Sequence, residues 1–156
     1  QEVSELHLLD LPSPGSIAQA QDLLVSLQAI DTSGKITTHG KNILQLGLHP
    51  RLAHMILTAQ ALDLTETSCL IAALLTEKDI LKTQSSDLGE RVALLQAIKI
   101  RNTTNSTSSA SIDKHQCHRV LKTARELQQR LKRTLKSSSS GSDKTDSEMT
   151  GVLLAF

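Results

Sequence analysis

The chain has 156 residues, a net charge of +1 at pH 7, and 38% hydrophobic residues that include one Phe and no Trp or Tyr. The core must therefore be aliphatic, and its Leu and Ala residues favour helices over strands. No run of about 18 apolar residues occurs, and no basic segment leads into an apolar one, so the sequence predicts neither a membrane span nor a signal peptide.

Three helical patterns and one turn occupy the N-terminal part. A Ser-Pro pair at 13–14 is typical of a helix start, and apolar residues follow it at three- and four-residue spacing. Residues 31–37, DTSGKIT, favour a tight turn or short hairpin in which Gly34 supplies a positive φ. Thr38 can cap a second helix, and Pro50 starts a third.

Three more helices are predicted in the remainder. Thr65 caps a fourth helix with a dense apolar centre, and Asp87 begins a fifth. Residues 102–112 are polar and aperiodic, which predicts a mobile loop. The sixth helix has an apolar stripe and ends before 137–150, a segment with the composition of a disordered linker. Residues 151–156 are interpreted as the start of a following, truncated domain.

Charge is unevenly distributed along the chain. Between Lys114 and Lys136 lie eight Lys or Arg residues and one acidic residue, Glu126. Such an asymmetry favours an anionic partner. A solvated helix face explains the same pattern, so the charge run alone leaves both interpretations open.

Two histidines and an arginine surround a proline in the stretch GLHPRLAHM, residues 47–55. Metal ligands on one helix usually lie three or four residues apart, whereas His49 and His54 are five apart, about 140° around the helix. No nucleophile with an oriented base and no phosphate-binding GxxxxGK[ST] loop is present. We therefore expect no catalytic residue, metal site or cofactor in this chain, and interpret the stretch as a joint between helices.

Cys69 and Cys117 both fall in apolar helical patterns. Two thiols so far apart form neither a zinc motif nor a disulfide framework, so we expect buried structural thiols and a reducing, cytoplasmic compartment.

The turn and the joint also carry a family resemblance. The pattern L.ALD..G.LT..G......L.L.PRLA.ML is matched at Leu27, Ala29, Ile30, Asp31, Gly34, Ile36, Thr37, Gly40, Leu46, Leu48, Pro50, Arg51, Leu52, Ala53 and Met55. The region resembles the helicase-associated region of DEAH-box ATP-dependent helicases. The run HPRLAHM, the later AALLTEKDIL and the closing GVLLAF look most like the bacterial HrpB branch of that family.

The resemblance implies a mainly α fold in two parts. Residues 1–62 would form a winged-helix module of three helices with a short β wing, together with the joint, and residues 63–136 a ratchet-like helical bundle. Helicases of this family hydrolyse ATP between two RecA-like domains, so ATP and magnesium would belong to motor domains outside this chain. This fragment would not be an enzyme itself and would hold single-stranded nucleic acid against those motors, with RNA favoured over DNA.

Seven basic residues of the joint and the sixth helix are the candidate nucleic-acid-binding set: Lys35, Lys41, Arg51, Arg119, Lys122, Arg125 and Arg130. The scarcity of aromatic residues argues against base-stacking platforms, so binding should rest on phosphate contacts with little base specificity. Arg51 could instead pair with Asp31 or Asp63 and lock the joint.

Two other functional classes stay open. A free-standing winged-helix regulator would read duplex DNA through the second helix. That helix offers His39, Lys41, Asn42 and Gln45. In a helical protein-interaction module, the basic face would simply be solvated.

Overall fold

The computed structural model describes residues 10, 12–82, 85–101 and 112–153, and the side chains of all these except 101 and 138–153. The helices are α1 (Pro14–Ser26), α2 (Thr38–Leu46), α3 (Pro50–Gln60), α4 (Thr65–Thr76), α5 (Leu88–Arg101) and α6 (Lys114–Leu153). The described residues add only two isolated antiparallel bridges, so the predicted mainly α class is confirmed. The loop predicted at 102–112 lies, apart from Ile112, outside the described residues.

The predicted tight turn forms between α1 and α2. Ile30 and Ile36 face each other in an antiparallel bridge, and Gly34 has a φ of 80°. The Asp31 carboxylate accepts hydrogen bonds from the backbone N–H groups of Ser33 and Lys35 at 2.8 and 2.9 Å. These bonds stabilise the turn, because the Asp31 side chain accepts hydrogen bonds from N–H groups that have no backbone acceptor in so short a loop.

Two of the predicted helix starts are displaced by one residue. Thr37, not Thr38, caps α2: it has an extended backbone, and its hydroxyl accepts a 2.9 Å bond from the Gly40 N–H. Adjacent threonines offer equal capping chemistry, and the backbone conformation decides between them. At α4 the N-cap is Leu64 and no side chain caps the helix, so the predicted Thr65 cap is wrong.

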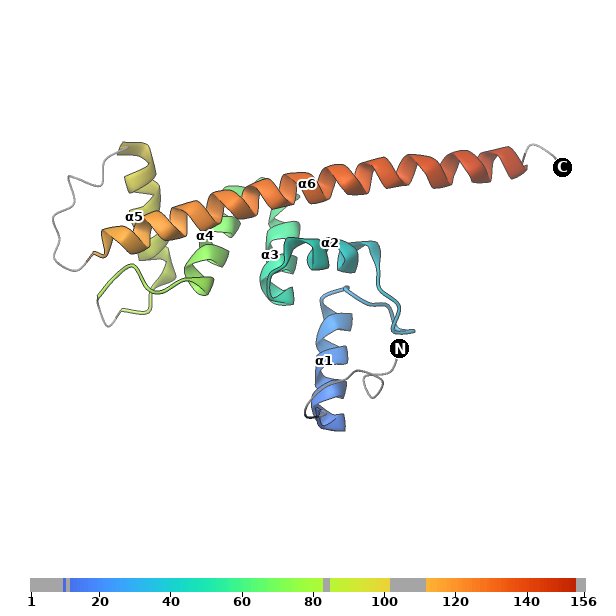
Figure 1. The fold of residues 1–156 in the computed structure, drawn as a ribbon, viewed down its shortest axis with the longest axis horizontal. Coiled ribbons are helices and arrows are strands. Elements are labelled where there is room, and N and C mark those ends of the chain that lie inside the picture. The colour runs from blue at the N-terminus through green and yellow to red at the C-terminus, as the bar shows by residue number, and fades with distance from the viewer. Residues whose placement is uncertain (1–9, 11, 83–84, 102–111, 154–156) are drawn as a thin grey trace.

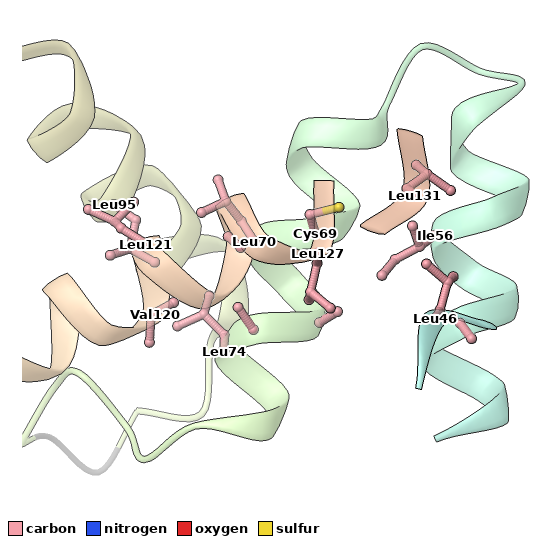
Figure 2. Packing of buried hydrophobic residues seen from close by; sticks show 14 of the residues in the cluster. Leu46, Ile56, Cys69, Leu70, Leu74, Leu95, Val120, Leu121, Leu127 and Leu131 are labelled. Carbon is pink, nitrogen blue, oxygen red and sulfur yellow. The ribbon is translucent and has the colours of Figure 1, made fainter. Parts of the chain in front are cut away.

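The long helix α6 organises the core. It runs along the molecule and packs against α2 and α4, α3 packs against both of these helices, and α1 stands apart (Figure 1). Its apolar stripe meets both ends of the core: Leu131 lies near Leu46 and Ile56, and Val120 lies near Leu74 (Figure 2). One hydrophobic cluster thus spans both sides of the boundary predicted at residue 62, and the division into two domains stays a prediction.

The N-terminal helix contributes less than its pattern predicted. α1 begins as expected, with the Ser13 hydroxyl accepting a 3.2 Å bond from Ser16 N–H and Pro14 at the first helical position. It contains no buried residue, and only Leu24 of its apolar face packs against the core cluster.

The end of the chain differs from the prediction. The structure continues α6 through Leu153, where we expected a linker at 137–150 and the start of a further domain at 151–156. Each residue added to an existing helix gains a hydrogen bond without a new nucleation cost, so a helix can continue into a polar sequence. Residues 154–156 lie outside the described residues. Within the described ranges, no helix is long and apolar enough to cross a membrane.

Candidate nucleic-acid interface

The basic residues of α6 fall on two different sides of the helix. At about 100° per residue, Lys122, Arg125 and Lys132 lie within an arc of about 80°, facing away from the buried stripe. All three are exposed, and within the part of the chain that the structure describes none forms an ion pair. We call these three residues the outward basic stripe. It extends for about 15 Å along the helix.

Arg119 lies on the flank of α6 that faces the end of α4. Its guanidinium is 3.2 Å from the Glu77 carboxylate, whose other oxygen accepts a 3.0 Å bond from the Thr123 hydroxyl. The side chain of Arg119 is 67% exposed, so the pair is screened by water and contributes little to stability. The structure therefore gives this candidate a protein partner that the outward basic stripe lacks.

Arg130 faces α2 on the same flank. Its Nη1 donates a 3.4 Å hydrogen bond to the carbonyl of Leu46, the last residue of α2. A cation is favoured at that end because the helix dipole leaves partial negative charge on the terminal carbonyls. Gly47, with a φ of 64°, ends α2 beside this arginine. Arg130 thus has a structural role in addition to its charge.

The joint presents the remaining candidates to solvent. Lys35, Lys41 and Arg51 are all exposed. No ion pair joins Arg51 to Asp31 or Asp63 among the residues described, so the alternative role of Arg51 as a lock is not seen. The Asp31 carboxylate is instead occupied within its own turn, where bonds from Ser33 and Lys35 lower its pKa.

The histidines of the joint interact in a way that the linear spacing did not predict. His39 Nε2 and His54 Nδ1 are 2.9 Å apart, with the rings edge to face, so α2 and α3 are joined by a hydrogen bond. Burial, and then the nearby His54, lower the pKa of His39. His49 caps α3 instead, its Nδ1 accepting a 3.3 Å bond from the Arg51 N–H. In the described ranges no three potential ligands cluster as a metal would require.

Sequence reasoning also missed a buried arginine. Arg91 of α5 is 6% exposed and donates to both oxygens of Asp79 at 2.8 and 2.6 Å. Its remaining bonds go to the backbone carbonyls of Asp87 and Ser85. The hydrogen bonds from Arg91 lower the pKa of Asp79 to about 2. This cluster joins α5 to Asp79, Ser85 and Asp87 and uses four of the five N–H donors of the buried guanidinium.

Both cysteines are fully buried, which confirms that they pack as small apolar side chains. Burial raises the pKa of Cys69 to about 11 and also raises the pKa of Cys117. A protonated, inaccessible thiol is a poor nucleophile.

The comparison with curated proteins found a relative that is named as a helicase homolog. No family model matches the chain. Over 75 residues, 48% of this chain, it is 33% identical to the human protein named ATP-dependent RNA helicase homolog DQX1, and spans 10% of its length. The expected resemblance is thereby supported: the chain is similar to a region of a helicase of this class.

The comparison with solved structures also found a match. The crystal structure of the E. coli DExH-box NTPase HrpB matches with a TM-score of 0.47 and 23% identity, covering 79% of this chain and 16% of that chain. At this TM-score the structural likeness carries no argument about function. The chain spans less than a fifth of either relative.

Proposed function

We propose that this chain is an accessory nucleic-acid-handling region of an ATP-dependent RNA helicase, where it holds a single strand against motor domains elsewhere in the parent protein. The observation that carries the proposal is the outward basic stripe, Lys122, Arg125 and Lys132, which are exposed and form no ion pair with the described residues. The name of the human relative, an ATP-dependent RNA helicase homolog, supports RNA over DNA.

The stripe suits a phosphate backbone better than base edges. Its cations lie within an arc of about 80° along a helix whose other side is packed into the core by Leu127 and Leu131. Phosphate contacts carry no sequence information, and the chain has one aromatic residue on which a base could stack. Binding should therefore be weak, indifferent to base sequence and strongly dependent on salt.

The chemistry of the parent would be divided between domains. ATP and magnesium would be bound by RecA-like motor domains, and this region would bind the single strand. The turn with Gly34 corresponds in this proposal to the short wing of a winged-helix module, and α4 to α6 to the ratchet-like bundle. Lys35, Lys41 and Arg51 around the joint would extend the basic surface beyond α6.

The duplex-reading alternative has less support from α2. Of the four side chains that this helix offers for base recognition, His39 is bonded to His54 and Asn42 is half-buried. Lys41 and Gln45 remain exposed, fewer than the three or four base contacts that a recognition helix usually makes.

A charge-reversal experiment tests the proposal. Lys122→Glu/Arg125→Glu would be compared with Lys78→Glu/Lys82→Glu, a matched double reversal at two exposed lysines outside α6. Fluorescence anisotropy of a labelled single-stranded oligouridylate would be followed across salt. We expect the α6 variant to bind at least about tenfold more weakly, and its salt slope to fall by about 1.4, which is 0.7 for each lost phosphate contact.

The control double reversal should change affinity much less. If both variants weaken binding equally, only the net charge matters and α6 is not the site. If neither does, the stripe is a solvated helix face and the proposal is wrong.

A further inference from the structure

A shallow, open groove lined by polar residues lies where α6 passes over the end of α2; the two helices pack side by side (Figure 1). It has a volume of about 550 Å³ and is lined by Gln45, Arg130, Arg133, Thr134 and Ser137. The lining contains two guanidinium groups and no carboxylate. The groove is therefore electropositive, and its Arg133, about 20° from Lys122 around α6, borders the outward basic stripe.

The walls of the groove are held in place by bonds between the two helices. The Ser137 hydroxyl and Gln45 Oε1 are 3.2 Å apart, and the Arg130 guanidinium donates to the Leu46 carbonyl. Positive charge from Arg130 thus offsets the partial negative charge at the end of α2, which would otherwise repel an anion. The Arg130 guanidinium and the Gln45 amide are thus held in place before a ligand binds, so these two groups lose little ordering entropy on binding.

Arg133 is the cation free to act on such a ligand. It is exposed, and within the described part of the chain it forms neither an ion pair nor a hydrogen bond. A guanidinium presents a planar fork that matches two oxygens of one phosphate, whereas a lysine ammonium acts as a point charge. The residue type and its place in the groove therefore fit bidentate recognition of a phosphate.

We propose that this groove binds one phosphodiester group of the single strand, with Arg133 as the direct ligand, Arg130 as supporting charge and the Gln45 amide as a neutral contact. The inference rests on the proposed function and adds a fixed contact to it. A phosphate held here touches α2 and α6 together, so the bound strand ties the joint to the bundle. The outward basic stripe alone would let a strand slide; the groove holds one nucleotide at a defined position.

The test uses the difference between a guanidinium, which can bind two oxygens of one phosphate, and a lysine ammonium, which acts as a point charge. Arg133→Lys and Arg133→Gln would be compared with Lys78→Arg, an exchange between the same two residue types at an exposed position outside α6, all in the 156-residue chain. Anisotropy with the labelled oligouridylate should show about threefold to tenfold weaker binding for both Arg133 variants and no loss for Lys78→Arg. Only Arg133→Gln should also reduce the salt slope, by about 0.7. Equal melting temperatures would establish that the fold is intact.

Two results would contradict the proposed phosphate site in the groove without contradicting the proposed function. In one, Arg133→Lys binds like the wild type although Lys122→Glu/Arg125→Glu still weakens binding, so that Arg133 supplies charge alone. In the other, NMR signals of the Arg133 Nε–H and Gln45 amide shift with inorganic phosphate but not with the oligouridylate, which indicates a free-anion site. Failure of the Lys122→Glu/Arg125→Glu variant itself to weaken binding would instead remove the proposed function.

Discussion

Replacing Asp79 with Asn tests how the segment between α4 and α5 is held. In the folded chain the Asp79 carboxylate faces the buried Arg91 through two hydrogen bonds of 2.8 and 2.6 Å. The Asn side chain keeps the shape but loses the charge and one acceptor, so the guanidinium stays buried with a weaker partner. We expect the free energy of unfolding to fall.

The pKa of Asp79 sets the size of this effect. Its pKa is about 2, against an ordinary value of 3.8, chiefly because of the hydrogen bonds from Arg91. A difference of this size corresponds to about 2.4 kcal/mol if unscreened. The Asp79 side chain is 48% exposed, and water screens the interaction, so we expect a loss of about 1 kcal/mol at neutral pH.

The same pKa difference predicts how the effect depends on pH. Because the folded pKa lies below the unfolded one, the ionised carboxylate stabilises the fold above about pH 4, and this contribution is lost as the pH falls toward 2. Urea unfolding followed by circular dichroism between pH 7 and pH 2.5 would measure it. The gap between wild type and Asp79→Asn should narrow as the pH drops, whereas Asp22→Asn, on the exposed surface of α1, should behave like the wild type at every pH. A gap that is absent at neutral pH, or that stays constant down to pH 2.5, would refute the reasoning.

Three further predictions concern the joint and the core. Because burial and His54 lower the pKa of His39 in the folded chain, the unfolded chain binds more protons than the folded one, and the melting temperature should fall as the pH drops from about 7 through 6.5. His39→Asn should flatten this pH dependence, and an unchanged profile of melting temperature against pH would contradict the prediction. Cys69 and Cys117 should react with a bulky maleimide only at the rate of unfolding, so fast labelling of the native chain would disprove their burial. Gly40→Ala should cost about 3 kcal/mol or more in urea unfolding, because the added Cβ would overlap a backbone carbonyl oxygen; near-normal stability would show that the turn relaxes.

Local sequence signals predicted where the helices begin and end better than they predicted which distant residues contact one another. Pro50 and the Gly47 end of α2 identified the joint correctly, because proline and glycine act through their own backbone preferences. The roles of Arg130 and His39 depend on residues 84 and 15 positions away, respectively, and no spacing rule reaches that far. Arg91 sits in a helix pattern that is equally compatible with exposure, and only the folded segment around Asp79 explains its burial.

In the candidate site, too, the local pattern was predictable and the contacts between helices were not. Periodicity correctly placed Lys122 and Arg125 opposite the apolar stripe of α6. It could not tell that Arg119 meets Glu77, or that Arg133, left out of the candidate set, faces α2 across a groove. Those distinctions depend on which helix packs beside each flank of α6.

Photo-crosslinking of a 4-thiouridine-containing oligouridylate to the chain, with the attachment sites mapped by mass spectrometry, tests the central claim most directly. If the strand follows α6, crosslinks should concentrate in peptides that carry Lys122, Arg125 and Lys132, with a further site near Arg133, and should disappear as salt is raised. Crosslinks spread evenly over the chain, or gathered on α1 and α5, would contradict the account.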